Sequence, residues 1–277
     1  MLPELFRALI LGVAEGITEW LPISSTGHMI LINDLLGASE DSFTSSEIFL
    51  YLIQLGAILA VVTLFFKPLF PFYPGKTPSQ KKQTWSLWFK IVVACVPGLV
   101  AGLVFNDLMD SIETPFLVAA MLILYGVLFI VVERTVNKDR KPTTEKLPAL
   151  TYKTALLIGC FQMLAIVPGT SRSGATILGA ILLGCSRVVA TEFSFFLAIP
   201  VMAGMSFLKI VKNGIPADVG QIVILLVGMV VAYVVSLFCL RKALDYIKTH
   251  SFEFFGKYRI VLGVILVVYF GVKALLA

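Results

Sequence analysis

Long apolar blocks dominate the hydrophobic pattern of this chain, and short polar segments separate them. Four blocks, at 48–66, 116–132, 219–240 and 260–277, approach the ~20 residues that a helix needs to cross the hydrocarbon of a bilayer. We therefore expect an all-α integral membrane protein. The full pattern predicts six crossing helices, at about 45–66, 86–106, 115–134, 189–209, 219–240 and 259–277.

Two further segments, 3–37 and 152–185, are apolar but are interrupted midway by Pro and by Ser or Thr. The loops that flank each segment must lie on one side of the membrane, so each segment is predicted to form a re-entrant helical hairpin. A hairpin tip leaves backbone groups unpaired at membrane depth, which is tolerable only where protein or a watery cavity surrounds it. The tips are therefore expected to be buried and functional.

The two hairpins repeat each other at a spacing of 147 positions. Each repeat would contain one hairpin and three crossings, and an odd number of crossings inverts the second copy in the membrane. We predict one membrane domain, 1–277, with repeat one at about 1–140 and repeat two at about 150–277, and with both tips near the midplane. The matching pairs are Gly12 and Gly159, Ser24 and Ser171, Gly27 and Gly174, and Gly37 and Gly184.

Composition and charge support this assignment and suggest an orientation. The chain is 58% hydrophobic and 14% charged, which excludes an ordinary soluble domain. Its net charge of +5 comes from basic connections at 67–90, 134–153 and 241–259, including Lys138 and Arg140, and this positive-inside pattern argues against nucleic-acid binding. Segments 34–47 and 106–113 carry acids, including Asp107 and Asp110, and no Lys or Arg. We expect these two segments and both termini outside the cell.

The first tip combines carboxylates with a helix start. Residues 15–28 read E-G-I-T-E-W-L-P-I-S-S-T-G-H, in which Pro22 breaks the entering helix and Ser24 is placed to cap a second helix that begins near Ser25. Free N–H groups, the helix dipole and nearby hydroxyls suit a phosphate. Glu15 and Glu19 lie four residues apart and share one helix face, where they can bind a cation or a proton or act in catalysis.

The second tip adds a positive charge. Residues 168–176 read P-G-T-S-R-S-G-A-T. Gly169 allows the turn more backbone conformations, and the planar guanidinium of Arg172 can donate two hydrogen bonds to phosphate oxygens. Two such tips facing each other could hold a diphosphate. The alternative is structural: small residues permit close helix packing, and Arg172 pairs with the carboxylates as a buried ion pair.

Three other polar residues extend this set. His28 follows Ser25 by three residues, so its imidazole can approach the Ser25 hydroxyl or a leaving phosphate. Gln54 and Glu192 lie in apolar helices and are candidates to line the same cavity, with packing or capping as the alternative. The four cysteines are scattered singly, without metal-ligand spacing, and are interpreted as packing residues.

These motifs together closely resemble the bacterial undecaprenyl-diphosphatase family, the BacA/UppP bacitracin-resistance proteins. The resemblance also includes I-Q-L-G at 53–56 and T-E-F-S-F at 191–195, and it covers essentially the whole chain. It implies an inner-membrane enzyme that hydrolyses the phosphoanhydride of the lipid carrier diphosphate. Such an enzyme regenerates the monophosphate for peptidoglycan synthesis and lowers sensitivity to bacitracin, which sequesters the lipid. A divalent cation, Mg²⁺ or Ca²⁺, is the implied cofactor.

The resemblance points to Glu15, Glu19, Ser25, His28 and Arg172 as essential positions and to Ser24, Thr26, Ser171 and Ser173 as phosphate contacts. Together with the motifs, it gives the substrate-binding candidates Ser24, Thr26, Gly27, Gln54, Thr170, Ser171, Ser173, Gly174, Thr176 and Glu192. For the mechanism, we expect Ser25 as the nucleophile with His28 as acid/base partner, while direct attack by water stays open. Glu15 and Glu19 would bind the metal or orient His28 and water.

The expected partners are the polyprenyl diphosphate substrate and membrane lipids, and a homodimer is left open. The site is expected to open toward the periplasm. A lipid-phosphate flippase or anion transporter is the alternative function, because inverted repeats with broken helices at the midplane are typical of transporters.

Overall fold

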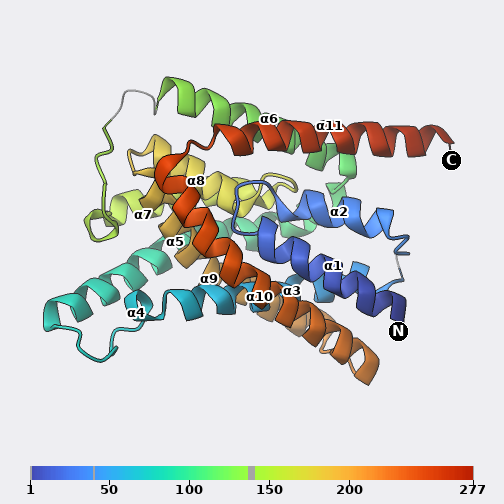
Figure 1. Ribbon diagram of the computed structural model, residues 1–277, viewed down its shortest axis with the longest axis horizontal. Helices are drawn as coiled ribbons and strands as arrows, with labels where there is room; N and C mark the ends of the chain where they lie inside the picture. The colour runs from blue at the N-terminus through green and yellow to red at the C-terminus, as the bar shows by residue number, and fades with distance from the viewer. Residues whose placement is uncertain (1, 40, 137–140, 277) are drawn as a thin grey trace.

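The fold is a bundle of helices. A computed structural model describes residues 2–39, 41–136 and 141–276, and no β-strand occurs within these ranges. Six described helices are long and apolar enough to cross a membrane, which confirms the predicted all-α membrane class. They are α3 (Glu47–Leu64), α5 (Pro78–Ile112), α6 (Pro115–Thr135), α9 (Arg187–Asn213), α10 (Val219–Thr249) and α11 (Glu253–Leu276) (Figure 1).

Several of these helices are longer than their apolar blocks predicted. Helix α5 covers 78–112 instead of 86–106, and α10 continues to Thr249, so much of the predicted loops 106–113 and 241–259 is helical. Hydropathy detects only the apolar part of a helix, whereas polar ends are specified by local bonds. At the start of α5, Thr77 N–H donates to Gln80 Oε1 while Gln80 N–H donates to Thr77 Oγ1, which is a capping box.

Both predicted hairpins are pairs of short helices. The first pair is α1 (Leu2–Thr18) and α2 (Ser25–Leu35), and the second is α7 (Tyr152–Met163), extended by η3 (Leu164–Ile166), and α8 (Arg172–Leu182). Helices α2 and α8 have 11 residues each. Such helices are about 16 Å long, roughly half of the hydrocarbon thickness, which supports a re-entrant arrangement. The remaining short elements are η1 (Phe43–Ser45), α4 (Phe66–Leu69) and η2 (Leu147–Ala149).

The two halves of the chain pack reciprocally. Helix α1 of the first hairpin packs on α10, and α7 of the second hairpin packs on α5, while α6 packs on α11 (Figure 1). Glycines permit both hairpin contacts: a Cβ at Gly12 would lie 2.7 Å from the carbonyl oxygen of Gly228, and one at Gly159 would lie 2.3 Å from that of Ala94. Gly12 and Gly159 are a predicted repeat pair, so their shared role is close helix approach. The division into inverted repeats stays a prediction.

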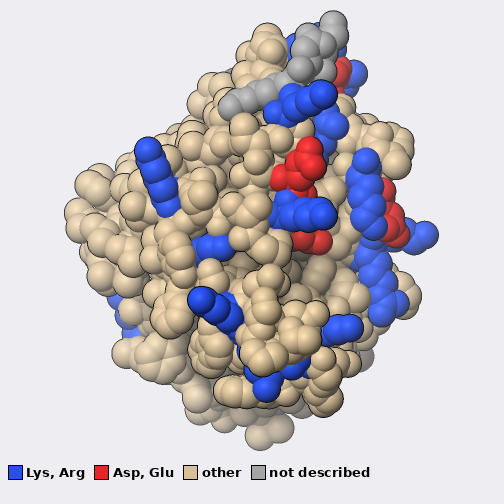
Figure 2. Space-filling model, turned by 90° about the vertical axis from the view of Figure 1, so that its left-hand side faces the viewer, with Lys and Arg blue, Asp and Glu red and all other residues tan. Residues whose placement is uncertain are grey.

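The ends of the bundle differ in charge. Figure 1 shows the α4–α5, α6–α7 and α10–α11 connections at one end and both termini at the other. Lys and Arg gather on the face at the first of these ends (Figure 2). The arrangement supports the predicted cytoplasmic assignment of the three basic connections. Lys138 and Arg140 lie outside the described residues, as do the side chains of Asp107 and Asp110.

Candidate functional site

The backbone has the same unusual conformation at both hairpin tips. Ser24 and Ser171 directly precede α2 and α8, and they have φ angles of 69° and 72°. Among the described residues other than glycine, these two are the ones with positive φ. The left-handed region costs an L-residue ~1–2 kcal/mol, and such conformations concentrate at functional sites.

The two serines differ in their hydrogen bonds. Ser171 Oγ accepts from the N–H of Gly174 at 3.1 Å and caps α8. Ser24 Oγ makes no cap bond, and although Ser24 is 1% exposed its hydroxyl has no partner within the described chain. The prediction that Ser24 caps the second helix is therefore wrong, because its hydroxyl does not reach the N–H groups of the first turn. Those N–H groups remain available to another acceptor.

An ion pair joins the two tips. Arg172 Nη2 lies 2.7 Å from Glu19 Oε1, and Ser25 Oγ donates to Glu19 Oε2 at 2.8 Å. Arg172 Nη1 donates to the carbonyl oxygen of Ser194 at 2.8 Å, while its Nε has no partner within the described chain. The structure thus brings together Glu19, Ser25 and Arg172, as the motifs predicted. The ion pair proposed as the structural alternative is also present.

His28 makes its hydrogen bonds with partners outside this group. Its Nδ1 lies 2.7 Å from the carbonyl oxygen of Ser24, and its Nε2 lies 2.8 Å from the hydroxyl of Tyr258. A carbonyl can only accept, so Nδ1 carries a proton and Nε2 of the neutral ring accepts from Tyr258. The predicted approach of His28 to the Ser25 hydroxyl is therefore wrong in this structure, because Glu19 receives the Ser25 bond and α11 supplies the second partner of His28. A catalytic role for His28 stays a prediction.

Glu15 lies one helical turn before Glu19 and is almost completely buried. It is 2% exposed, and its Oε1 has no hydrogen-bond partner in the described chain. Mg²⁺ and Ca²⁺ take oxygen ligands, and Mg²⁺ is usually held by one or two carboxylates together with substrate phosphates and waters. The described residues contain no cluster of three His, Cys, Asp or Glu side chains suited to a metal. Both oxygens of Glu19 have partners, whereas Oε1 of Glu15 has none within the described chain, so Glu15 offers a buried oxygen to a cation that phosphate oxygens help to coordinate.

A cavity of about 540 Å³ reaches the ion pair. Its polar end is formed by residues of the two tips, and α5 and α9 extend it with apolar side chains. The polar lining residues from the tips are Glu19, Ser25, Thr26, Ser171 and Arg172, and the apolar residues include Leu99, Leu103, Val201, Phe207 and Leu208. The cavity therefore combines charged and hydroxyl groups from the tips with a larger apolar lining.

The other predicted substrate contacts differ in whether they line the cavity and in whether their polar atoms already have hydrogen-bond partners. Gln54 lines the cavity, whereas Glu192 is not among its lining residues. Ser173 Oγ donates to the carbonyl oxygen of Leu21, and Thr176 Oγ1 donates to that of Arg172, so both hydroxyls bond within the tips. Thr170 is fully buried, and its hydroxyl has no partner in the described chain.

The two predicted glycines of the tips are packed closely. A Cβ at Gly27 would lie 2.9 Å from Leu122 Cδ1, and one at Gly174 would lie 3.0 Å from Arg259 Nη1. Glycine at these positions thus serves the packing of the tips, in line with the small-residue alternative.

Arg259 and Gln162 are among the polar residues of the site that sequence reasoning missed. Arg259 was placed in a basic loop, but it is 0% exposed in α11. It donates to the carbonyl oxygens of Pro22 at 3.2 Å and of Gly169 and Thr170 at 2.9 Å each, and so ties both tips together. Gln162 lines the cavity with a buried Oε1 that has no described partner. It follows Glu15 by 147 positions, so the internal repeat contained the signal that finds it.

The described part of the chain has six apolar helices that are long enough to span a membrane, which defines a multi-pass membrane protein. Its two short hairpins bring a carboxylate, a hydroxyl and an arginine to a largely apolar cavity. The bacitracin resistance protein BacA family matches residues 8–265, and the chain belongs to this family. This confirms the resemblance seen in the motifs.

Curated relatives match over nearly the full length. The chain is 52% identical to an undecaprenyl-diphosphatase of Enterococcus faecalis over 265 residues, which are 95% of each chain. It is 51% identical to one of Streptococcus mutans over 276 residues, or 98% of each chain. It is 50% identical to one of Desulfitobacterium hafniense over 277 residues, or 99% of each chain.

Proposed function

We infer that this protein is an undecaprenyl-diphosphate phosphatase, which hydrolyses the phosphoanhydride of the lipid carrier diphosphate to the lipid monophosphate and inorganic phosphate. Family membership and identity of about half of the residues with undecaprenyl-diphosphatases support this activity. The structural observation that carries it is the amphipathic cavity, whose charged end holds Glu19, Ser25 and Arg172. Such activity recycles the carrier for peptidoglycan synthesis and reduces the pool that bacitracin sequesters.

The two ends of the cavity match the two parts of this substrate. The N-termini of α2 and α8 carry partial positive charge, which favours phosphate oxygens, and the first turn of α2 has no side-chain cap. Arg172 adds a full positive charge and an unpaired Nε. Apolar residues of α5 and α9, such as Leu103 and Phe207, suit the isoprenoid chain.

Ser25 is placed for attack with Glu19 as its proton acceptor. The Ser25 hydroxyl already donates to Glu19 Oε2 at 2.8 Å, so attack on the terminal phosphorus would transfer its proton to that carboxylate. The phosphoanhydride bond then breaks and the lipid monophosphate leaves, while Arg172 and the helix N-termini stabilise charge on the transferring group. Water would hydrolyse the phosphoserine. Water oriented by Glu19 could also attack directly, without a covalent intermediate.

Glu15 and Glu19 are the residues that would hold a divalent cation, together with substrate oxygens. A bound cation neutralises phosphate charge during transfer. The orphaned Oε1 of Glu15 supports this assignment.

We further propose that the protein lies in the cytoplasmic membrane and that its site opens to the periplasmic side. Glu113, in the connection between α5 and α6, lines the cavity. That connection lies toward the end of the molecule that carries the termini, away from the basic end (Figures 1 and 2). The positive-inside rule favours the basic end as cytoplasmic.

The decisive experiment measures phosphate release by the purified protein from undecaprenyl or farnesyl diphosphate. A phosphatase releases inorganic phosphate and leaves the lipid monophosphate, whereas a flippase or anion transporter releases none. The Arg172→Ala variant, purified in the same way, controls for contaminating phosphatases. Equal release by both preparations would contradict the proposed function.

A further inference from the structure

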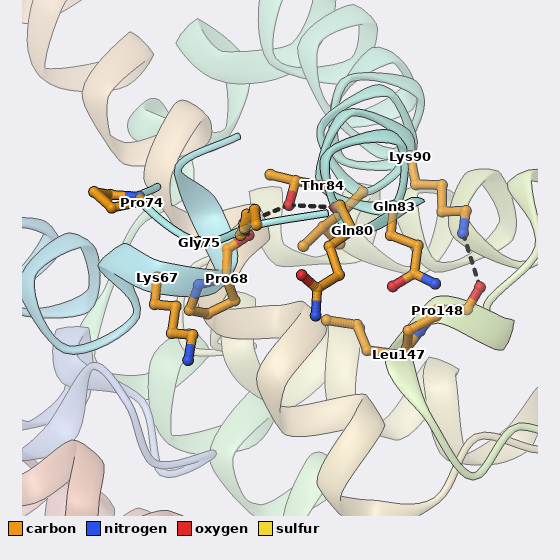
Figure 3. A pocket seen from close by; sticks show the side chains of 12 residues that line it. Lys67, Pro68, Pro74, Gly75, Gln80, Gln83, Thr84, Lys90, Leu147 and Pro148 are labelled. Carbon is orange, nitrogen blue, oxygen red and sulfur yellow. Dashed lines mark hydrogen bonds between the residues drawn. The ribbon is translucent and has the colours of Figure 1, made fainter. Parts of the chain in front are cut away.

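A second cavity, of about 550 Å³, lies at the basic end of the molecule. It is formed by α4, the 70–77 connection, the first turns of α5 and the η2 segment (Figure 3). Its polar lining residues are Lys67, Lys76, Gln80, Gln83, Thr84 and Lys90, and none of them lines the cavity at the hairpin tips. We call this second space the basic cavity.

The lysines of the basic cavity lack counterions. Among the described residues that line it there is no Asp or Glu. Neither Lys67 nor Lys90 has an ion-pair partner within the described ranges. Lys90 is only 6% exposed, and its Nζ has a single hydrogen bond, to the carbonyl oxygen of Pro148 at 3.3 Å. Lys67 Nζ and Lys90 Nζ also lie over the rings of Tyr73 and Tyr152, at 5.9 Å and 5.7 Å from the ring centroids. These contacts leave the positive charges without a counterion, so an anion in this cavity would be stabilised.

Lys76 and the glutamines complete the polar lining. Lys76 Nζ donates to Thr84 Oγ1 at 2.6 Å and to the carbonyl oxygens of Phe70 at 3.0 Å and Pro68 at 3.3 Å, so its three hydrogens are used and it contributes its charge at a fixed position. Burial and the charge of Lys67 lower the pKa of Lys76, which a bound anion would reverse. In Figure 3 the side chains of Gln80 and Gln83 extend from α5 into the space between Lys67 and Pro148.

The surroundings place this cavity at a membrane surface. Large aromatic side chains of α4, the 70–77 connection and α5 are exposed beside it, among them Phe72 at 64%, Trp85 at 45% and Phe89 at 59%. Exposed aromatic residues next to lysines are typical of the boundary between lipid and water. Ligands present at this depth include lipid headgroups, whose phosphates accept hydrogen bonds from lysine and amide groups.

We propose that the basic cavity is a binding site for a phosphate group at the membrane surface. An anionic lipid headgroup and free phosphate share this chemistry, and two arms of one experiment separate them. The proposal does not depend on the phosphatase activity, because its residues are distinct from those of the hairpin tips.

The test compares two triple variants of the full-length protein in detergent. The cavity variant carries Lys67→Gln, Lys76→Gln and Lys90→Gln, and the matched control carries Lys81→Gln, Lys82→Gln and Lys153→Gln, which remove the same charge from exposed positions outside the cavity. The lipid arm measures the Kd of dioleoyl phosphatidic acid by native mass spectrometry, with dioleoylglycerol as the lipid without phosphate. The phosphate arm measures inorganic phosphate by equilibrium dialysis at constant ionic strength.

The expected result is that the cavity variant weakens phosphatidic acid binding at least about tenfold, while the control stays within about twofold of the unaltered protein. The same pattern for inorganic phosphate would identify free phosphate as the ligand. Because the hairpin tips are unchanged in both variants, the difference between them isolates the basic cavity. Equal Kd values for the two variants in both arms would overturn the proposal.

A single substitution tests the same site in case the triple cavity variant does not fold. Gln83 is exposed on α5 and lines the cavity, so Gln83→Glu adds a carboxylate there without removing a buried group. It should weaken phosphate-group binding about tenfold while thermal melting is unchanged. Unaltered binding by a folded Gln83→Glu protein would also contradict the site.

Discussion

Glu19 is the residue on which the hydrogen bonds of the hairpin tips converge. One of its oxygens pairs with Arg172 and the other accepts the Ser25 hydroxyl, so both partners are oriented before any substrate binds. Preorganised groups of this kind lose little freedom when the reaction begins. A phosphate that enters the site would compete with Glu19 for Arg172, which would leave the carboxylate free to take the Ser25 proton.

This geometry predicts covalent catalysis by Ser25. The Ser25→Ala variant should lose turnover while it still binds the lipid diphosphate, because the helix N-termini and Arg172 remain. The unaltered enzyme, quenched during turnover of substrate labelled in its terminal phosphate, should carry label on Ser25. If Ser25 only donates a hydrogen bond, the variant would retain hydrolysis with a barrier raised by about 1–3 kcal/mol, and no label would be found.

Ser24 carries two energetic penalties in one place. Its φ of 69° is unfavourable for an L-residue, and its buried hydroxyl has no described partner. Replacement by Gly relieves both, so Ser24→Gly should stabilise the fold by about 1–2 kcal/mol after the flexibility of glycine is subtracted. Turnover should fall, because the hydroxyl is then missing from the phosphate site.

Thermal melting and phosphate release of the same Ser24→Gly preparation measure the two effects. Ser171→Gly is the matched control, since it relieves the same φ but gives up the bond from Gly174 N–H, and it should gain less stability. A Ser24→Gly protein that is fully active would show that substrate does not need this hydroxyl.

At the scale of elements, the lengths of the apolar blocks and their interruptions by Pro, Ser and Thr were enough to find the six long helices and both pairs of short helices. It could not find the ends of α5, α10 and α11, because polar turns outside the hydrocarbon carry no hydropathy signal. It also placed Arg259 in a loop, since a lone Arg beside an apolar block resembles the end of a helix. The partners of Arg259 are carbonyls of residues far away in sequence, which only the folded structure brings together.

Only part of the candidate site could be predicted, because local motifs place residues that are near in sequence but not their partners from distant helices. Glu19, Ser25 and Arg172 lie in local motifs whose helix starts bring them to the tips, and they meet in the structure. The partner of His28 could not be read from its spacing to Ser25, because Tyr258 arrives from α11, 230 positions away.

Gly169 shows how closely the second tip fits its neighbour. Its φ is +89°, and a Cβ there would lie 2.6 Å from both the Cα and the carbonyl oxygen of Val118 in α6. Gly169→Ala should therefore lower the free energy of unfolding by about 1–3 kcal/mol and lower the melting temperature. Gly271→Ala in α11 is the control, because nothing lies within 4 Å of its added Cβ and its φ is not positive. Equal melting temperatures for the two variants would contradict the close fit.

At the scale of the whole molecule, the sorting of charge to one end predicts the orientation in the membrane. In a cysteine-free background, Lys76→Cys should react with a membrane-impermeant maleimide only after cells are opened, because the 70–77 connection is expected in the cytoplasm. Ser39→Cys, in the segment after α2, should react in intact cells. Labelling of Lys76→Cys from outside would reverse the topology.

The shared spacing of the two hairpins has a consequence for how a ligand can enter. Ser24 and Ser171 correspond, and the first residues of α2 and α8 correspond, yet Ser25 in one copy is Arg172 in the other, and Glu15 is matched by the neutral Gln162. Two identical tips would bind the two phosphates of a diphosphate in either direction. The paired positions therefore differ in charge, with Glu15 and Ser25 on the first tip where Gln162 and Arg172 stand on the second. We expect a lipid diphosphate to bind between the tips in one direction, with its terminal phosphate toward Ser25.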